Sequence, residues 1–308
     1  MPKRRGFLLG LSAGVLALIG CSPGGTSSSG GSGAKPTVVV GSTNFAEQLL
    51  VAELYAQALE AKGYSITRKF NLGSREIVAP ALASGQIDLY PEYLASYLTF
   101  LTNDPTKASS DPAKTYAALQ EAAKAKNVTA LQYAPAQDEN GFVVTRATAD
   151  KDKLSKIGDL AALNGQLVLG GPPECPTRPF CLQGLQKVYG LTFKDFKALD
   201  TGGPLTVAAL KGGQIDVGEL FTSDAAIQAN GFVLLQDDKG LQLSDNLVPV
   251  VRSAIASQAP ADFATTLNAV SAKLTTAELT GLNKQVGLDK QDPKPVAGAW
   301  LKAQGLVT

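Results

Sequence analysis

Apolar and polar positions along the body of the chain follow two periods, one typical of short strands and one typical of helices. Three β-branched residues at 38–40 predict a strand, and residues 46–62 carry leucines and alanines at the spacing of a helix. Further strands are expected at 66–72 and 87–90, with a helix from 74 or 75 to 84 between them. Alternation of this kind predicts a parallel sheet.

The second half of the chain repeats this alternation. It predicts strands at 166–170, 196–199 and 215–219, with helices at 182–189 and 205–211. An apolar run at 248–255 then leads back toward the first half, and residues 260–304 have the pattern of carboxyl-terminal helices.

An eight-residue phrase occurs at 81–88 and again at 209–216, and its two copies are 128 residues apart. Both have the form Ala-Leu-x-x-Gly-Gln-Ile-Asp, which predicts the end of a helix closed by glycine and then a strand. The same offset pairs Tyr93 with Phe221. Each half is therefore expected to carry an aromatic ring just past a strand's carboxyl end, where open α/β sheets bind ligands.

The order of elements predicts two lobes, because the chain enters the second and then returns to the first. Lobe I is expected at 36–142 and 250–308 and lobe II at 143–249, with hinges near 142–145 and 249–252. Around such hinges two lobes can close on a ligand. The predicted fold class is α/β, with a mostly parallel sheet flanked by helices in each lobe.

The amino terminus has the pattern of a secretory signal. Lys3, Arg4 and Arg5 precede an apolar run at 7–20 that is too short to span a bilayer. The run ends in Leu-Ile-Gly-Cys, which matches the bacterial lipobox, so we expect residues 1–20 to be removed and Cys21 to be lipidated. The basic start fits both the twin-arginine and the Sec export routes.

Residues 21–35 are rich in Gly, Ser, Thr and Pro and predict a flexible tether to the outer face of the plasma membrane. After removal of residues 1–20, the chain would contain 25 Lys and Arg and 27 Asp and Glu, which gives a net charge of −2. A balance so close to neutral does not predict nucleic acid as a partner.

Two further cysteines, Cys175 and Cys181, lie close together in a segment that contains three prolines. In an oxidising compartment so close a pair favours a disulfide. A metal site is the competing interpretation. It has little support, because the chain has no histidine and no second cysteine pair.

The lack of histidine also excludes most enzyme classes. Neither Ser-His-Asp nor Cys-His machinery can be built, and no Gly-x-Ser-x-Gly segment occurs. Carboxylate pairs remain, such as Asp88 with Glu92 or Asp216 with Glu219. Charges close after a strand are more typical of solvated or capping groups than of an acid and base. We therefore expect no enzyme activity, no metal and no cofactor.

Four segments carry a family resemblance. They are Gly41-Ser42-x-Asn44-Phe45-x-Glu47-Gln48, residues 85–93 (Gly-Gln-Ile-Asp-Leu-Tyr-Pro-Glu-Tyr), Gly171-Pro172-Pro173-Glu174 and Asp237-Asp238-Lys239. Together they resemble the osmoprotectant-binding proteins of ABC importers, the family of glycine betaine, carnitine and choline receptors. The resemblance covers nearly all of the chain after the tether and implies the two-lobe type II periplasmic-binding-protein fold.

The resemblance also implies a site for a quaternary ammonium ligand, which has no hydrogen to donate and is recognised by aromatic faces. Tyr93 matches a cage tyrosine of the family, and Ser96 matches a position held by a hydroxyl or a carboxylate. Asn140 and Phe142 match an Asn-x-Tyr pair, with Phe in place of Tyr. Arg178 matches an arginine that grips the ligand carboxylate.

Three more residues complete the expected site. Phe221, the repeat partner of Tyr93, can supply a ring from lobe II, and Gln48 and Asn44 can contact ligand, cap the first helix, or do both. Structural roles are the alternative: core packing for the phenylalanines, half-buried packing for Tyr93 and an exposed position for Arg178. Residues 202–205 offer no aromatic ring, so the expected cage is thinner than in family members with several tyrosines.

The expected function is capture of a small compatible solute, such as glycine betaine, by an extracytoplasmic receptor of an ABC importer. Its expected partners are the permease with its ATPase and, through Cys21, the membrane. We expect it to act as a monomer. Alternatives are a receptor for another polar or amphipathic solute or an amino acid, an envelope or signalling lipoprotein without transport, and a hydrolase that uses carboxylates.

Overall fold

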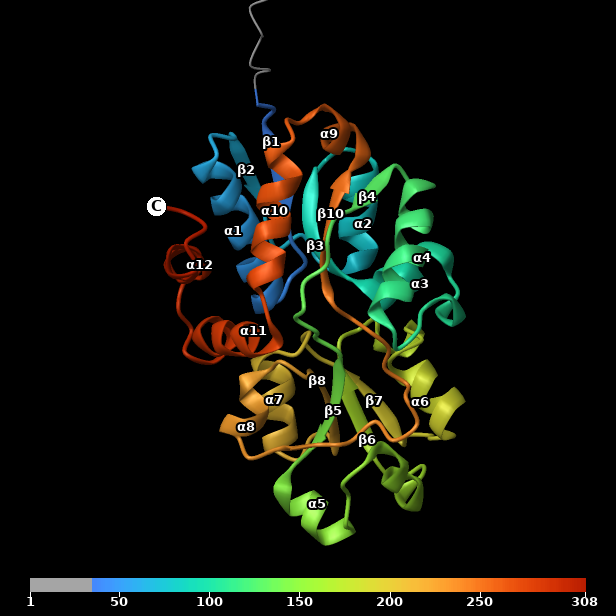
Figure 1. Ribbon diagram of the computed structural model, residues 1–308. Coiled ribbons are helices and arrows are strands. Elements are labelled where there is room, and N and C mark those ends of the chain that lie inside the picture. Colours follow the sequence, from blue (N-terminus) through green and yellow to red (C-terminus); the bar gives the residue numbers. More distant parts are fainter. Residues whose placement is uncertain (1–34) are drawn as a thin grey trace, which may run out of the picture. The chain divides into compact units, whose positions relative to one another are not determined.

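Two five-stranded sheets form the framework of the computed structural model, which describes residues 35–308 (Figure 1). The strand order is β2-β1-β3-β10-β4 in the first sheet and β7-β6-β8-β5-β9 in the second. The first sheet consists of β1 (Val38–Gly41), β2 (Ile66–Lys69), β3 (Leu89–Tyr93), β4 (Val128–Ala130) and β10 (Leu247–Arg252). The second consists of β5 (Asn140–Val144), β6 (Val168–Gly171), β7 (Asp195–Ala198), β8 (Val217–Phe221) and β9 (Val233–Leu234).

Parallel and antiparallel neighbours are mixed in both sheets, for the same reason. In the first sheet β1 is parallel to β2 and β3, while β10 is antiparallel to β3 and β4. In the second, β6 is parallel to β7 and β8, while β5 is antiparallel to β8 and β9. Strands β5 and β10 are the ones that arrive from the other lobe, so each runs against its neighbours. The two-lobe α/β class is confirmed, with mixed rather than mostly parallel sheets.

Helices accompany each sheet (Figure 1). Lobe I contains α1 (Ala46–Ala61), α2 (Arg75–Ala83), α3 (Leu94–Thr102), α4 (Pro112–Lys124), α9 (Ser253–Gln258), α10 (Asp262–Lys273), α11 (Thr276–Asn283), the π-helical turn η4 (Lys284–Leu288) and α12 (Pro293–Ala303). Lobe II contains α5 (Arg146–Asp152), α6 (Leu182–Tyr189), α7 (Pro204–Lys211) and α8 (Ala225–Ala229). Short 3₁₀ turns are η1 (Pro105–Lys107), η2 (Ile157–Leu163) and η3 (Cys175–Thr177). Within residues 35–308, none of the helices combines the length and the hydrophobicity that crossing a bilayer requires.

The repeated phrase forms the same local structure in both lobes. The Asp88 carboxylate accepts a hydrogen bond of 2.9 Å from the backbone N–H of Val39, and the Asp216 carboxylate accepts one of 2.8 Å from Val168. Each aspartate thus ties its own strand to the neighbouring parallel strand. The arginine of β10, Arg252, adds an ion pair to Asp88 at 2.6 Å. These contacts give the aspartates of the phrase a structural role.

Both strands of the repeat begin two residues later than predicted. The turn that closes each helix takes up the first residues expected in the strand, because Gly85 and Gly213 have positive φ angles of 79° and 65°. The glycines let the backbone N–H groups of Gln86 and Gln214 reach back to the carbonyls five residues earlier, which closes the helices. Tyr93 and Phe221 are therefore the last residues of β3 and β8 instead of lying just past them.

The two crossings between lobes lie outside the predicted hinges. Residues 142–145 fall in and directly after β5, and residues 249–252 fall inside β10, where ladder hydrogen bonds hold them. The connecting segments are 131–139 and 235–246, and they pair with each other at Gln137 and Asn246. Both predicted boundaries, 142/143 and 249/250, fall inside strands: residues 140–142 pair with β8 and residues 247–249 pair with β3.

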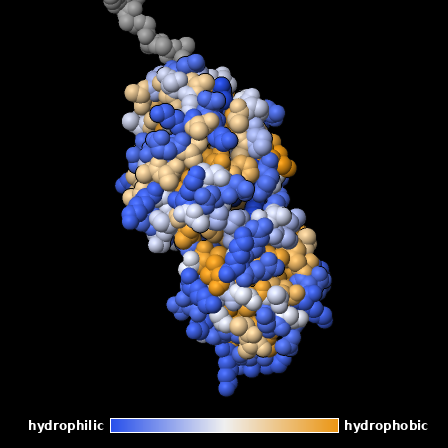
Figure 2. All heavy atoms as spheres, turned by 90° about the vertical axis from the view of Figure 1, so that its right-hand side faces the viewer, coloured by the Kyte–Doolittle hydropathy of each residue, from blue (hydrophilic) through white to orange (hydrophobic). Residues whose placement is uncertain are grey.

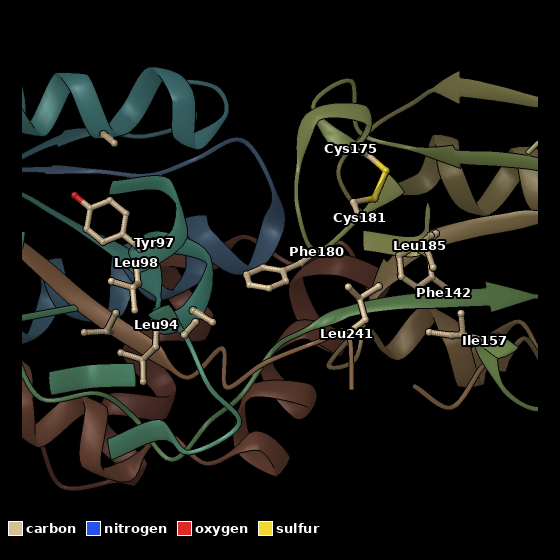
Figure 3. Close-up of a cluster of buried hydrophobic side chains, with 14 of the residues drawn as sticks. Leu94, Tyr97, Leu98, Phe142, Ile157, Cys175, Phe180, Cys181, Leu185 and Leu241 are labelled. Atoms are coloured by element: carbon tan, nitrogen blue, oxygen red, sulfur yellow. A yellow bond between two sulfur atoms is a disulfide. The ribbon is translucent and has the colours of Figure 1, made fainter. Parts of the chain in front are cut away.

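A hydrophobic cluster continues from lobe I into lobe II. It includes Leu94 and Leu98 of α3 together with Phe142 and Leu185 of lobe II (Figure 3). Figure 2 shows the side of the molecule with α3, α4 and α6, which is mainly hydrophilic and has hydrophobic residues close to the narrow region between the lobes. Hydrophobic side chains therefore pack against one another at the junction of the lobes as well as inside each lobe.

Three sequence predictions lie outside the described residues. The signal sequence at 1–20, the lipidation of Cys21 and nearly all of the tether at 21–35 belong to the part of the chain that precedes residue 35.

Candidate functional site

A cleft between the lobes contains most of the predicted site residues. Its volume is about 480 Å³, and its walls come from the beginning of α1, α2, the end of β3, α3 and the lobe II segments around 177–183, 201 and 221. Seven of the eight predicted ligand residues line it: Asn44, Gln48, Tyr93, Ser96, Asn140, Arg178 and Phe221. Strand ends and helix beginnings of both lobes meet here, which agrees with the position of ligand sites in open α/β sheets.

Phe142, the eighth, lies elsewhere. It is only 1% exposed and packs in the hydrophobic cluster with Leu185, Ile157 and Leu241 (Figure 3). In β5 the side chains of Asn140 and Phe142 point to the same face, but Phe142 is two residues further from the strand end that borders the cleft. Phe142 is therefore a core residue, and the predicted Asn-x-Phe pair contributes only its asparagine to the cleft lining.

Tyr93 reaches the cleft from the end of β3 and is held by a carboxylate. Its hydroxyl donates a hydrogen bond of 2.6 Å to Oε1 of Glu47 in the first turn of α1. Ser223 from lobe II and Asn283 at the end of α11 donate to the other oxygen of Glu47. This network fixes the orientation of the Tyr93 ring and connects the two lobes.

Asp138, in the first connecting segment, belongs to the same buried group. Its Oδ1 accepts a hydrogen bond of 2.9 Å from the backbone N–H of Ser223. Burial raises the pKa of Glu47, against the hydrogen bonds that it accepts. Burial and the neighbouring charge of Glu47 hold the pKa of Asp138 well above its ordinary value. Each of the two buried carboxylates therefore makes ionisation of the other less favourable.

A stacked aromatic pair crosses the cleft. The rings of Phe45, just before α1, and Phe221, at the end of β8, have centroids 5.1 Å apart and planes inclined by 25°. Gly202 lies against Phe221: a Cβ there would come within 2.7 Å of the ring, and its φ is +61°. Gly202, which brings no ring of its own, thus makes room for the ring of Phe221 from β8.

Two more phenylalanines line the cleft. Phe100 of α3 is 37% exposed, and Phe180 of the disulfide loop is 7% exposed and points toward lobe I (Figure 3). With Phe45, Tyr93 and Phe221, five aromatic residues border the cleft. Phe45, Phe100 and Phe180 are thus aromatic residues of the lining that were not included in the cage expected from the sequence. Features of the sequence could have indicated two of these residues. Phe45 belongs to one of the family motifs, and Phe180 lies two residues after Arg178.

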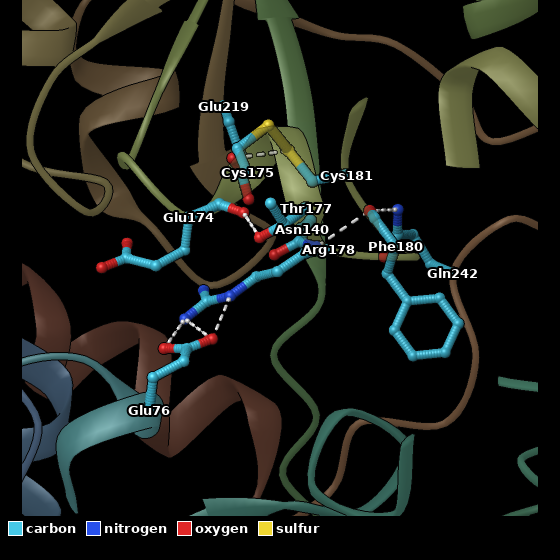
Figure 4. The surroundings of a disulfide bond; sticks show 10 residues. All are labelled: Glu76, Asn140, Glu174, Cys175, Thr177, Arg178, Phe180, Cys181, Glu219 and Gln242. Carbon is cyan, nitrogen blue, oxygen red and sulfur yellow. Dashed lines mark hydrogen bonds and ion pairs between the residues drawn. A yellow bond between two sulfur atoms is a disulfide. The ribbon is translucent and has the colours of Figure 1, made fainter. Parts of the chain in front are cut away.

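Arg178 lies at the cleft and is already engaged. Its guanidinium forms an ion pair with Glu76 of α2, with 3.1 Å from Nη2 to Oε2 and 3.3 Å from Nη2 to Oε1 (Figure 4). Burial acts to raise the pKa of Glu76, but the Arg178 guanidinium outweighs it and lowers that pKa to about 2. The pair joins lobe II to lobe I. No pattern in the sequence indicates that Glu76 would be the partner of Arg178, because their contact depends on how the two lobes pack together.

Further charges line the cleft. Arg75 holds Glu92 with two hydrogen bonds of 2.8 Å, and Glu92 is buried. Ser96 donates to Asp245 from its backbone N–H at 2.8 Å and from its hydroxyl at 2.7 Å. Burial raises the pKa of Asp245 to about 6. Neither carboxylate is arranged as a free acid or base.

Several buried polar groups of the cleft make no hydrogen bond within residues 35–308. They are the hydroxyls of Thr43 and Thr99, both ends of the Gln48 amide and Oδ2 of Asp138. A buried polar atom without a partner costs about 1–3 kcal/mol, so such groups are rarely left unpaired without a reason. All four of these residues line the same cleft, so the cleft offers a polar ligand several groups that lack a hydrogen-bond partner within residues 35–308.

Asn44 and Gln48 do not cap the first helix. The N-cap residue of α1 is Phe45 and receives no side-chain hydrogen bond. Asn44 is exposed at the border of the cleft, and Gln48 is buried with its amide directed to the lining. Asn140 donates a hydrogen bond of 3.0 Å to the carbonyl of Phe180, so it also holds the disulfide loop in place (Figure 4).

Cys175 and Cys181 form a disulfide that closes this loop (Figure 4). Oε2 of Glu219 lies 2.8 Å from Sγ of Cys181. Since a disulfide sulfur carries no hydrogen, only a protonated carboxyl can donate in this contact. Burial raises the pKa of Glu219 to about 7. Cys175, Cys181 and Glu219 also have their ligand atoms close together, but the sulfurs are consumed by the disulfide.

A second cavity of about 670 Å³ also has Phe45 and Phe221 in its lining. It is bordered by α7, α8 and η4, with Lys211 and Lys290 among its residues. The stacked rings therefore belong to the lining of both cavities.

The sequence matches the family described as the substrate-binding domain of an ABC-type glycine betaine transport system over residues 36–303. It is 28% identical over 277 residues to the glycine betaine-binding protein YehZ of Escherichia coli K12, covering 87% of this chain and 90% of that one. It is 27% identical over 282 residues to a glycine-betaine-binding protein of Pseudomonas aeruginosa, covering 88% and 89%.

Solved structures agree with this family. A glycine betaine/carnitine/choline ABC transporter structure has a TM-score of 0.69 with 26% sequence identity, and the match covers 87% of this chain and 99% of the other. Members of this family are the solute-binding components of importers and are not enzymes. The chain belongs to the substrate-binding domains of ABC-type glycine betaine transport systems and is the extracytoplasmic solute-binding protein of an osmoprotectant importer.

Proposed function

We propose that the protein captures a quaternary ammonium compatible solute, such as glycine betaine or choline, in the cleft of about 480 Å³ between its lobes. The observation that carries the proposal is the combination of five aromatic rings with buried polar groups that make no hydrogen bond within residues 35–308. The relatives named for glycine betaine support this ligand class.

The chemistry of the lining fits the two ends of such a solute. A quaternary ammonium is attracted by ring faces, each worth roughly 0.5–2 kcal/mol, and by the carboxylate of Asp245, which has no arginine or lysine partner in the described part of the chain. The oxygen of the solute, carboxylate or hydroxyl, meets the hydroxyl of Thr43 and the amide of Gln48, both of which are buried without a partner in the described part of the chain. Tyr93 and Phe221 supply rings from opposite lobes.

Closure of the lobes delivers the solute to the permease. The segments 131–139 and 235–246 are the connections around which the lobes turn. Phe45 and Phe221 stack from opposite lobes, so a bound cation that joins this pair stabilises the closed form. The closed form is the one presented to the permease and its ATPase.

The lipobox at Cys21 supports attachment of the protein to the outer face of the plasma membrane. The mature protein would then begin with a diacylglyceryl cysteine followed by a flexible tether. Labelled fatty acid incorporated by the wild type and lost in Cys21→Ser, together with release of that variant from the membrane fraction, tests this anchor. Equal labelling of both would contradict it.

Isothermal titration calorimetry on the purified protein tests the ligand class. Glycine betaine, choline and carnitine are titrated beside alanine and proline, which carry no quaternary nitrogen. We expect binding of at least one quaternary solute and its loss in Tyr93→Ala. Tyr116→Ala is the matched control, because this half-buried tyrosine of α4 lies outside the cleft lining. Binding only of the amino acids, or none at all, would overturn the proposal.

A further inference from the structure

Within residues 35–308, the side chain of Arg178 forms hydrogen bonds only with Glu76, and this ion pair crosses from one lobe to the other. Both residues line the cleft. The side chain of Arg178 is 25% exposed and that of Glu76 is 42% exposed, so solvent reaches the pair at its edge. The plane of the guanidinium faces the carboxylate with two of its nitrogens (Figure 4).

Every arginine of the cleft lining is thus paired with a carboxylate of the protein. Arg75 is held at 2.8 Å by both oxygens of Glu92, which is buried and also accepts the hydroxyl of Tyr90. No lysine is among the lining residues in the described part of the chain. A ligand carboxylate therefore finds no free cationic partner, whereas neutral donors are free at Thr43 and Gln48.

We propose that Glu76 is a specificity-determining residue: by occupying the Arg178 guanidinium it makes the cleft favour a quaternary ammonium alcohol over the corresponding carboxylate. This inference rests on the proposed function, because it concerns the second half of the same ligand. The alcohol needs only an uncharged donor or acceptor, which the unpartnered Gln48 and Thr43 supply.

A carboxylated solute has a different cost. To reach Arg178 it must displace Glu76, and its carboxylate then lies close to that of Glu76. The two neighbouring carboxylates repel each other, and the displaced Glu76 loses its charge-assisted hydrogen bonds to Arg178. If it stays away from Arg178, the ligand carboxylate is held only by neutral groups in a cleft that also contains the carboxylate of Asp245. Both arrangements favour the alcohol.

Calorimetric titration of Glu76→Gln with choline and with glycine betaine tests the inference. We expect the ratio of the two dissociation constants to shift toward glycine betaine by about tenfold, the change typical of one charge-assisted hydrogen bond. Choline weakens modestly, because the cleft loses a negative charge. In the double variant Glu76→Gln with Arg178→Gln the shift must disappear, because the freed guanidinium is what binds the carboxylate.

Glu60→Gln is the matched control. Glu60 pairs with Arg68 at 2.6 Å on the far part of α1, with 39% and 26% exposure of the two side chains, and it lies outside the cleft lining. Glu60→Gln removes the same charge from a comparable ion pair. The ratio of its dissociation constants for choline and glycine betaine must therefore equal that of the wild type. Glu76→Ala serves as a second variant if the glutamine alters folding.

The possible failures are distinct. If choline and glycine betaine bind but Glu76→Gln leaves their ratio unchanged, or if the shift persists without Arg178, the inference is wrong while the proposed function stands. If neither solute binds any of the variants or the wild type, the proposed function and the inference fall together.

Discussion

Phe45 and Phe221 face each other across the two lobes with ring centroids 5.1 Å apart. Phe45 precedes the first turn of α1, and Phe221 ends β8. One ring belongs to each lobe, so the pair exists only when the lobes are close together. Such an aromatic pair can bind a cation, and it forms only when the two lobes have closed.

We predict that Phe221→Ala weakens binding of a quaternary ammonium solute by about 1–2 kcal/mol, or about five- to thirtyfold. The ring lost is one face for the cation and half of the stacked pair. Phe196→Ala is the control, because this half-buried phenylalanine of β7 belongs to the same lobe but not to the cleft lining. Calorimetry measures both. Equal affinities of the two variants would contradict a role of Phe221 in the site.

Phe142 gives a prediction of the opposite kind. Its ring is 1% exposed in the cluster that joins the lobes, so Phe142→Ala should lower the free energy of unfolding by about 3–5 kcal/mol. The affinity of the folded protein should stay within twofold of the wild type, since Phe142 is absent from the cleft lining. Urea unfolding and calorimetry at low temperature separate the two effects. Phe142→Leu offers a milder variant with the same expected direction, and a large loss of affinity in it would restore Phe142 to the site.

The repeat predicted the positions of Tyr93 and Phe221 well, because it is a local feature. Helix end, glycine and aspartate recur in order, and the same hydrogen bonds from Val39 and Val168 result. The exact strand limits could not be read from it. They depend on the glycine-closed helix ends, which keep residues 86–87 and 214–215 tied to the helices.

The rest of the site depends on contacts between the lobes. Glu76 meets Arg178 over 102 residues of sequence, and Ser223 meets Glu47 over 176. Neither contact has a local pattern, because both arise only when two separately formed sheets are brought together. For the same reason the mixed sheets were missed: β5 and β10 pair with strands of the lobe that they enter, which apolar periodicity along the chain does not reveal.

Asp245 makes ligand binding depend on pH. Burial raises the pKa of this cleft carboxyl from its ordinary value of 3.8 to about 6, against the hydrogen bonds from Ser96. A bound cation favours the ionised carboxylate, so binding lowers the pKa and releases a proton. The affinity for a quaternary ammonium solute should therefore rise with pH and level off above about 6. We expect binding at pH 5 to be about tenfold weaker than at pH 7.5.

Calorimetric titrations at these two pH values, repeated in buffers with different ionisation enthalpies, measure the affinity and the proton release. Asp245→Asn should bind more weakly at pH 7.5 and should show a smaller change with pH. Asp150→Asn, an exposed aspartate in α5 outside the cleft lining, is the control and should behave as the wild type. A pH dependence that is the same in all three proteins would rule out Asp245 as its source.

Glu219 makes the stability of the fold depend on pH in the other direction. Burial raises its pKa from an ordinary value of about 4.5 to about 7 in the folded protein. Below pH 4.5 both folded and unfolded states are protonated. Between 4.5 and 7 the unfolded state releases the proton first, so the free energy of unfolding falls as the pH rises. Well above 7 the loss is complete and is about 3–4 kcal/mol.

Glu219→Gln removes this loss, because the amide has nearly the same shape and carries no charge. We expect the variant to match the wild type at pH 4 and to be more stable at pH 8 by about 3 kcal/mol. Urea unfolding at pH 4, 6 and 8 measures the difference, with Glu121→Gln, an exposed glutamate of α4, as the control. The carboxyl lies against Sγ of Cys181 and close to Gly171, so the surroundings leave little room for water to hydrate its charge. A stability difference between wild type and Glu219→Gln that stays constant over this range would mean that Glu219 ionises in the folded protein as it does in the unfolded chain.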